Sequence, residues 1–218
     1  MSATLRRIVL PAVLVAMVTA GCSSGTDGGE EDRGLPADEV CGAFAKEPQP
    51  SSALKAIAGE GNFTSDLSEP EKVIGSLRDA ARTDQGAKTR TQPIPFCWLL
   101  PAKGGEWDLQ VTFREALSVP ERDTRLQETV TYFTTGERAS SSDSLASVFF
   151  ACRMKDPAHE IFIQAQLEAP GVNEVPEKER RAHQVTVANA AARKVASDLG
   201  CQNDTKLVSG VPTPEPGQ

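Results

Sequence analysis

Two β-hairpins are predicted in the middle of the chain by segments in which apolar and polar residues alternate. The first hairpin has strands at 94–100 and 107–113, joined by the turn sequence PAKGGE. The second has strands at 145–152 and 161–168, joined by RMKDPAHE. In the returning strand of each hairpin the apolar side chains share one face: Trp107, Leu109, Val111 and Phe113, then Ile161, Ile163, Ala165 and Leu167. This alternation predicts a mostly antiparallel sheet with one buried face.

Helices are predicted on both sides of these hairpins by apolar residues that recur every three or four positions. The longest helix covers 177–199, and Gly200 is a typical stop. An earlier helix follows Ser68, because Ser68 and Glu71 match a capping box. Two shorter helices are predicted nearer the N-terminus, at 35–46 and 51–58.

This order of helices, strands and a closing helix predicts an α+β fold in a single domain over 37–201. The mostly antiparallel sheet is expected to be packed on one side by the N-terminal helices and the long C-terminal helix. A further strand is expected within 128–135 and a loop over 136–144. The proline-rich segment 202–218 is predicted to be a disordered tail.

The first 21 residues have the layout of an export signal. Arg6 and Arg7 precede an uncharged run of thirteen residues, Ile8–Ala20, and Gly21 follows. A membrane span needs about 20 apolar residues, so this run is too short to be one. The sequence therefore predicts a signal peptide over 1–21. The arginine pair leaves both the general and the twin-arginine export routes open.

A single cysteine, Cys22, stands where this apolar run ends. The small residues Thr19-Ala20-Gly21 in front of it resemble, together with Cys22, the lipobox of bacterial lipoproteins. The resemblance implies cleavage between Gly21 and Cys22 and lipidation of the Cys22 thiol, with acyl chains such as palmitate. It also implies attachment to the extracytoplasmic face of the cell membrane. Residues 22–36 are rich in Gly, Ser and acidic residues, which is typical of a flexible tether.

The mature chain is acidic. Without residues 1–21 it has 21 basic and 30 acidic residues, a net charge of −9. Proteins bind nucleic acids largely by neutralising phosphates, so this charge argues against a nucleic-acid partner. Anionic headgroups would also repel the domain, which leaves the acyl chains on Cys22 as the expected contact with the lipid bilayer.

Four further cysteines are an even number, which outside the cytoplasm favours two disulfides. They stand 56, 55 and 49 residues apart, too far for CxxC metal or redox motifs: Cys41, Cys97, Cys152 and Cys201. Three pairings are possible. The favoured one is Cys41–Cys97 with Cys152–Cys201, because each bond then stays within one half of the domain and a strand cysteine can pin the closing helix. The nested pairing, Cys41–Cys201 with Cys97–Cys152, is the alternative.

Several motifs occur together around these cysteines. They are Cys41 near the mature N-terminus, FCWLL around Cys97, TTGERA at 134–139 and ANAAARKVASDLGC in the closing helix. Together they resemble a family of actinobacterial envelope lipoproteins classed as a domain of unknown function, and the similar extracellular sensor domains of mycobacterial serine/threonine kinases. The resemblance implies a small sheet with packed helices, two disulfides and a groove, facing outward from the membrane. It supplies no catalytic residues.

The sequence contains no recognisable catalytic or metal-binding motif. The two histidines, His159 and His183, are too few for a histidine-rich metal site, and neither stands near a GxSxG nucleophile. No catalytic residue, metal ligand or cofactor is therefore assigned. Trp98 and Trp107 lie in the first hairpin. Core packing explains them, and a platform on which a sugar or lipid stacks is the functional alternative.

These observations favour a non-catalytic envelope lipoprotein that binds a small ligand, lipid, glycan or partner protein through its sheet or a groove. The second candidate is an accessory protein that docks on another envelope protein through an exposed apolar patch. The third is a carboxylate-based hydrolase, which would need paired Asp or Glu side chains about 5–10 Å apart in a cleft.

Overall fold

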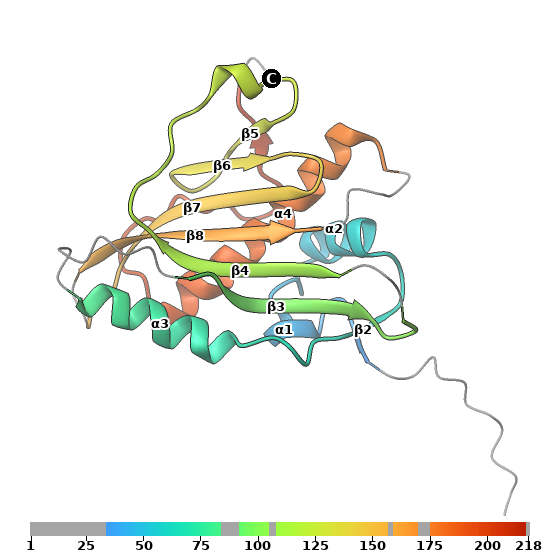
Figure 1. Cartoon of the computed structure of the whole chain (residues 1–218), viewed down its shortest axis with the longest axis horizontal. Helices are drawn as coiled ribbons and strands as arrows, with labels where there is room; N and C mark the ends of the chain where they lie inside the picture. The colour runs from blue at the N-terminus through green and yellow to red at the C-terminus, as the bar shows by residue number, and fades with distance from the viewer. Residues whose placement is uncertain (1–33, 84–91, 105–107, 157–158, 170–174, 217–218) are drawn as a thin grey trace, which may run out of the picture.

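The computed structural model describes residues 34–83, 92–104, 108–156, 159–169 and 175–216, and these form an α+β fold around one sheet. Within these residues the sheet has nine antiparallel strands in the order β1-β2-β3-β4-β8-β7-β6-β5-β9 (Figure 1). The strands are β1 Leu35–Pro36, β2 Asn62–Thr64, β3 Ile94–Pro101, β4 Leu109–Ala116, β5 Thr131–Thr134, β6 Arg138–Ser141, β7 Leu145–Arg153, β8 Glu160–Glu168 and β9 Thr213–Pro214. The helices are α1 Val40–Ala43, α2 Pro48–Ala58, α3 Pro70–Arg82 and α4 Glu177–Leu199. Both predicted hairpins and the long closing helix are confirmed.

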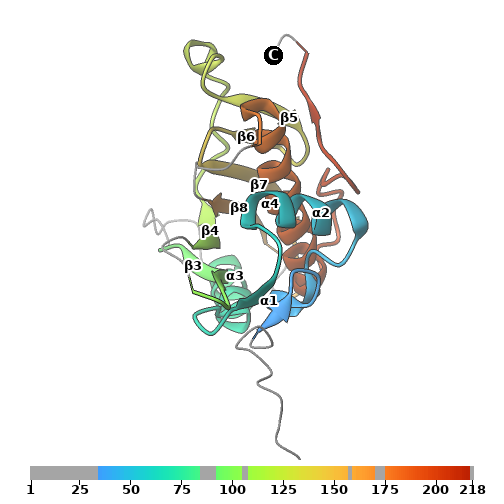
Figure 2. The ribbon, with the colours of Figure 1, turned by 90° about the vertical axis from the view of Figure 1, so that its right-hand side faces the viewer.

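The helices lie on one face of the sheet. α4 crosses β5, β6, β7 and β8, and α3 lies beside it against β3 and β4. α2 packs on α4 rather than on the strands, so sheet, α4 and α2 form successive layers (Figure 2). An ion pair of 2.9 Å between Nη1 of Arg193 and Oε2 of Glu47 links α4 to the start of α2. In the described part of the chain, the opposite face of the sheet is left without an α-helix.

Small side chains bring α4 close to the sheet. Its buried apolar residues include Val185, Ala188, Ala191, Ala192 and Val195. Opposite them lie Val148 and Phe150 of β7 and Ile163 and Leu167 of β8, the inward positions of the predicted alternation. The helix ends at Gly200, which adopts the left-handed conformation with φ of 69°. The apolar positions read from the sequence therefore form the core as expected.

The two disulfides form with the favoured pairing. Cys41–Cys97 joins α1 to β3, and Cys152–Cys201 joins β7 to the residue that follows Gly200. The nested alternative is excluded. Each disulfide bonds part of the helical layer covalently to a strand, so the closing helix is pinned to the sheet as expected.

The helices near the N-terminus differ in detail from the prediction. The helix expected at 35–46 is reduced to α1, in which Cys41 and Gly42 have positive φ values. The capping box expected at Ser68 is wrong, because α3 begins at Pro70 and no side chain caps it. The hydroxyl of Ser68 instead accepts a hydrogen bond of 2.9 Å from the backbone N–H of Trp98. Ser68 therefore binds strand β3 and does not cap α3.

Residues 136–144 are not simply the loop that their polar composition predicted. They contain β6, which pairs with β5 on one side and β7 on the other. Alternate residues of this strand, Ala139 and Ser141, are buried beneath α4. The Ser141 hydroxyl donates to Oε1 of Gln184 in α4 at 2.8 Å, which explains how a serine is accepted there.

Residues 202–216 are also ordered, although 202–218 was predicted to be disordered. Asn203 binds both backbone groups at the end of β7: its Oδ1 accepts from the N–H of Arg153 at 2.7 Å and its Nδ2 donates to the carbonyl of Ala151 at 3.0 Å. Further along, Nδ2 of Asn189 in α4 donates to the carbonyl of Val208 at 2.8 Å. With β9 at the C-terminal end and β1 at the N-terminal end, the domain extends beyond 37–201 in both directions.

The signal peptide over 1–21, its boundary at Gly21 and Cys22, and Trp107 lie outside the described residues. Where the structure describes helices, none is both long and apolar enough to cross a membrane.

Replacing Cys152 and Cys201 together by alanine should lower the free energy of unfolding by about 4 kcal/mol, because the bond closes a loop of about 50 residues in the unfolded chain. Urea denaturation of the C152A/C201A variant measures this loss. The C41A/C97A variant, which opens a loop of similar length, should lose about as much. A loss below about 1 kcal/mol in both variants would contradict a stabilising role of the disulfides.

Candidate ligand pocket on the open sheet face

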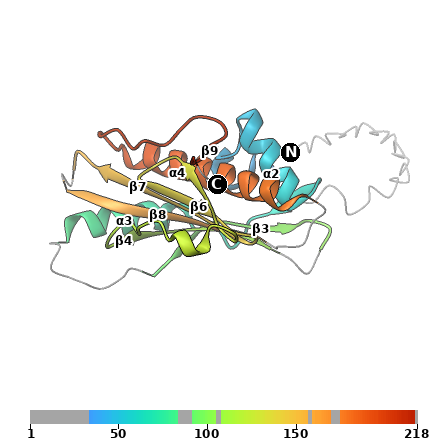
Figure 3. The ribbon, with the colours of Figure 1, turned by 90° about the horizontal axis from the view of Figure 1, so that it is seen from above.

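The face of the sheet opposite α4 is crossed by a single loop within the described ranges. Residues 117–130, called the strap below, leave the end of β4 and cross to β5. Figure 3 shows the 3₁₀ turn of the strap, Thr124–Leu126, on the opposite side of the sheet from α4. Tyr132 of β5 holds the strap in place, since its hydroxyl oxygen accepts a hydrogen bond of 2.9 Å from the backbone N–H of Asp123.

A pocket of about 210 Å³ lies where the strap leaves the sheet. Its lining includes Arg114, Glu115 and Ala116 of β4, Leu117 of the strap, Phe149 of β7 and Gln164 of β8. Gln164 is paired with Arg114 on one side and with Phe149 on the other. Three neighbouring strands therefore form the floor of the pocket, and the strap forms its wall.

Hydrogen bonds between side chains fix the polar part of this floor. Nε of Arg114 donates to Oε1 of Gln164 at 2.7 Å. Nε2 of Gln164 donates in turn to the hydroxyl of Ser147 at 3.3 Å and to Oε1 of Gln166 at 3.2 Å. Gln164 is only 6% exposed, so both ends of its amide are bonded in a largely dry environment. The guanidinium of Arg114 is thus held in one orientation beside the cavity.

Apolar groups complete the lining. Phe149 is 8% exposed and forms an aromatic part of the floor, whereas Leu117 on the strap is 52% exposed. Glu115 pairs with Ile163, so its side chain lies on the helix-covered face of the sheet, where burial raises the pKa of its carboxyl above the ordinary value. Glu115 is the single acidic residue among those that line the pocket, so the paired carboxylates of a hydrolase are not assembled there. A cationic group beside an apolar wall suits a small anion that carries an apolar substituent.

Trp98, which the sequence predicted as a possible stacking residue, lies outside the pocket. Trp98 pairs with Gln110, four residues before Arg114 on β4, so it lies about 13 Å along the strand from the row that forms the pocket. Its indole N–H is buried and has no partner within the described residues. Stacking on Trp98 remains a prediction, at a place outside the pocket.

Among the described residues, the histidines and acidic groups form no metal site. His183 lies on α4 with its Nε2 3.5 Å from Glu179, and His159 lies in the turn before β8. Where the structure describes the chain, no three His, Cys, Asp or Glu side chains are grouped as metal ligands would be.

Sequence analysis missed the residues that form the pocket. Arg114 and Gln164 occupy the polar positions of alternating strands, and this placement is visible in the sequence. The strap, however, has no periodicity, and its path over the sheet depends on Tyr132 and on contacts between distant segments. The sequence could therefore predict that one face of the sheet is polar, but it could not predict the pocket beneath the strap.

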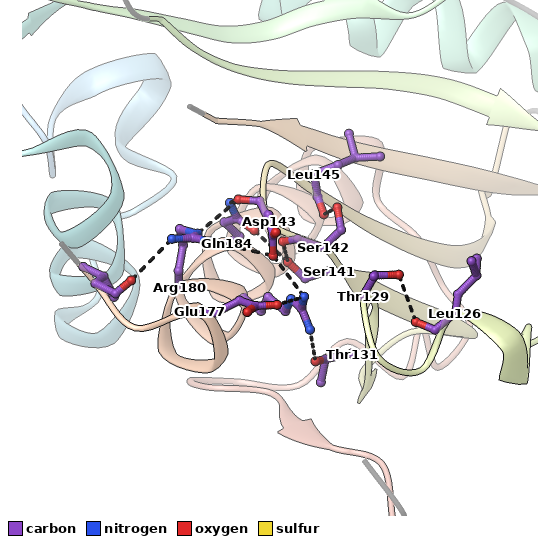
Figure 4. A network of polar contacts seen from close by, with 12 residues as sticks. Leu126, Thr129, Thr131, Ser141, Ser142, Asp143, Leu145, Glu177, Arg180 and Gln184 are labelled. Carbon is purple, nitrogen blue, oxygen red and sulfur yellow. Dashed lines mark hydrogen bonds and ion pairs between the residues drawn. The ribbon is translucent and has the colours of Figure 1, made fainter. Parts of the chain in front are cut away.

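A second polar cluster, the polar seam, joins the first half of α4 to the turn after β6 (Figure 4). Arg181 is buried and donates to Oδ1 of Asp143 at 2.9 Å and to Glu177 one turn earlier. Gln184 is fully buried and donates through Nε2 to the carbonyl of Asp143 at 2.9 Å. Nε of Arg180 donates to the same carbonyl at 3.1 Å. Most groups of the seam bind one another, although the buried Nε of Arg181 has no partner within the described residues. The seam attaches α4 to the sheet.

No protein-family model matches the chain, and the searches of curated proteins and of solved structures found no significant match.

The polar seam should make stability depend on pH through Asp143. Its hydrogen bond with Arg181 holds the pKa of the Asp143 carboxyl below its ordinary value. A lowered folded-state pKa adds stability above the unfolded pKa, which is near 3.9, and this stability is lost as the pH falls through the folded pKa.

The D143N variant should therefore be less stable than the wild type at pH 7, by about 1 kcal/mol because Asp143 is more than half exposed. The difference should shrink toward pH 2. Urea denaturation across this pH range measures it. D79N, which removes an ion pair on the exposed surface of α3, serves as the control and should differ little from the wild type. If D143N lowered the free energy of unfolding equally at pH 7 and pH 2, the ionised Asp143 carboxylate would not be the source of the stability.

Proposed function

We propose that this chain is a lipid-anchored lipoprotein on the extracytoplasmic face of the cell membrane, and that it binds a small ligand in the pocket beneath the strap without catalysing a reaction. The family it resembles in sequence, the actinobacterial envelope lipoproteins with the sensor-like domain, is part of this proposal. The identity of the ligand is left to experiment.

The pairing of the cysteines is the observation that carries the proposal. Cys41 pairs with Cys97 and Cys152 with Cys201, so four of the five cysteines of the chain are used in disulfides. Disulfides of this kind persist in oxidising compartments. The fifth cysteine, Cys22, has no cysteine left within the chain with which to pair. A cysteine at the end of an export signal is explained if its sulfur is acylated.

The position of the domain relative to Cys22 suits a tether. Residues 23–33 separate Cys22 from the first described residue, and eleven residues span at most about 40 Å. The chain enters the domain at β1, which forms one edge of the sheet. The anchor would therefore hold the domain near the membrane by the edge formed by β1 and β2, leaving the open sheet face accessible.

The pocket supports ligand binding through its chemistry. It combines the fixed guanidinium of Arg114 with the apolar ring of Phe149 in a cavity of about 210 Å³. A small anion with an apolar substituent could contact both groups at once. The polar chain from Arg114 to Ser147 is already bonded, so the site needs little rearrangement before binding, which reduces the entropic cost of association.

Docking to another envelope protein is the second candidate. It is favoured by two exposed leucines on the strap, Leu117 at 52% and Leu126 at 45% exposure. Exposed apolar side chains on a projecting loop are typical of protein contact sites when they form one patch.

The anchor is tested by replacing the cysteine that would carry it. The C22A variant, expressed with its leader in a lipoprotein-producing bacterium, should leave the detergent phase and enter the aqueous phase on detergent partitioning. The reason is that each methylene of an acyl chain contributes about 0.8 kcal/mol to membrane binding. S23A is the matched control and should stay in the detergent phase. A wild-type protein whose Cys22 thiol is free by mass spectrometry would refute the anchor.

Ligand binding in the pocket is tested by a substitution that fills the pocket with a larger side chain. Native mass spectrometry of the membrane-extracted wild type should find a non-covalent mass of a small molecule in addition to the acylated chain. A116F places a ring in the pocket and should lose this mass. T134F makes a comparable change at an exposed position on the same sheet face outside the pocket, and should retain it. No extra mass in the wild type, or equal retention by both variants, would count against ligand binding in this pocket.

A further inference from the structure

Two arginines share one carboxylate at the sheet edge formed by β5 and β9. Arg122 comes from the strap and Arg138 from β6; they are called the arginine pair below. Their side chains are 26% and 25% exposed. Nη1 of Arg122 lies 3.4 Å from one carboxylate oxygen of Glu215, and Nη1 of Arg138 lies 3.3 Å from the other. Two positive charges therefore face one negative charge.

The arginine pair also has donors that are not used. Nε of Arg122 and Nε of Arg138 are both buried, and neither has a hydrogen-bond partner within the described residues. The ring of Tyr132 lies near both guanidinium groups, with centroid distances of 5.3 and 6.0 Å. An aromatic face is only a weak acceptor, so these contacts do not replace hydrogen bonds. Buried donors are rarely left unpaired in native proteins, and these two need an explanation.

The geometry at Glu215 is poor by the standard of this same protein. Arg125 binds Asp123 through two short bonds, Nε–Oδ1 at 2.9 Å and Nη2–Oδ2 at 2.7 Å. That is the usual two-point contact between guanidinium and carboxylate. Glu215 makes one long contact to each arginine instead, because its two oxygens are divided between two guanidinium groups. The carboxylate has too few oxygens to occupy both.

We propose that the arginine pair is a binding site for a tetrahedral oxyanion of the phosphate type, and that Glu215 occupies it as a displaceable stand-in. A phosphate has enough oxygens to accept from Nε and Nη of both arginines, and its charge at neutral pH balances theirs better than one carboxylate does. The site lies outside the pocket beneath the strap and does not depend on that pocket being occupied.

The segment that carries Glu215 is held in a way that permits this exchange. β9 has only two residues, and one of them, Pro214, has no backbone N–H to donate. The backbone N–H of Glu215 donates to the carbonyl of Tyr132 at 2.9 Å. Rotation of the Glu215 side chain away from the arginines leaves this backbone bond intact, so an anion can enter without unfolding the tail.

The position of the site favours a soluble ligand over a lipid headgroup. β1 and β9 form the two opposite edges of the nine-stranded sheet (Figure 1). Eight strand spacings of about 4.8 Å separate them by about 38 Å. This preference rests on the proposed anchor: the tether joins the domain at the β1 edge, so the arginine pair lies at the edge farthest from the attachment point, which favours a free phosphate or a soluble phosphomonoester.

Calorimetric titration of the detergent-solubilised mature protein with inorganic phosphate, at constant ionic strength set with chloride, tests the proposal. The E215Q variant should bind phosphate about tenfold more tightly than the wild type, because the competing carboxylate is gone. The E215Q/R138Q variant should lose this binding. E215Q/R125Q removes an exposed arginine from the same strap and should bind as E215Q does. Near-ultraviolet circular dichroism verifies that each variant is folded.

Three results would overturn the proposal. The first is equal or absent phosphate binding by folded E215Q and wild-type protein. The second is binding by folded E215Q/R138Q that is as tight as binding by E215Q. The third comes from glycerophosphoglycerol, a soluble phosphodiester headgroup with one charge fewer. Its binding should be weaker than that of phosphate, and equal or tighter binding would point to lipid headgroups and exclude the soluble monoester.

Discussion

The contact between α4 and the sheet is the constraint on which the rest of this structure depends. Ala188, Ala191 and Ala192 are fully buried, and side chains of this size let a helix lie close to β7 and β8. Larger side chains at such positions typically cost 1–3 kcal/mol through overpacking. The polar seam fixes the first half of α4 to the turn after β6, and the Cys152–Cys201 bond fixes its end to β7. The helix is therefore positioned at both ends as well as along its face.

Because α3 and α4 cover one face, the polar alternate residues of the strands gather on the other. These side chains would be costly to bury if they lacked partners. Arg114, Gln164 and Ser147 avoid this cost by binding one another across three strands. A polar face that is satisfied internally can be crossed by a loop without being filled with apolar side chains. The cavity beneath the strap follows from that arrangement.

The sequence predicted the elements whose patterns are set locally. The period of α4 and the alternation of β4 and β8 could be inferred, because each reflects which side chains must be buried. The favoured cysteine pairing could also be inferred, because it keeps each bond within one half of the domain. Ser68 shows why other features could not. Its hydroxyl can cap a helix or bind a strand, and only the folded chain determines that the N–H of Trp98 is its partner. The same holds for β6, whose Ser141 is accepted in the interior because Gln184 lies opposite.

The ordered tail and the candidate sites could not be predicted from the sequence for a related reason. A proline-rich segment has little tendency toward regular structure, yet two asparagines fix this one. Asn203 of the tail binds the backbone of β7, and Asn189 of α4 binds the tail's backbone carbonyl at Val208. The pocket and the arginine pair both require the strap, and its path depends on Tyr132. These contacts join residues far apart in the chain, which no local pattern encodes.

The covalent attachment of Glu215 determines which ligands could replace it. A group held beside its partner by β9 competes at an effective concentration of about millimolar or higher. A free carboxylate offers the arginine pair nothing that Glu215 does not already provide, so it would displace the tail only at higher concentrations than this. An anion with more oxygens gains contacts at Nε of Arg122 and Arg138, which Glu215 leaves unpaired. The tail therefore excludes weak acids by competition while it keeps the two guanidinium groups arranged for a ligand that can bind both.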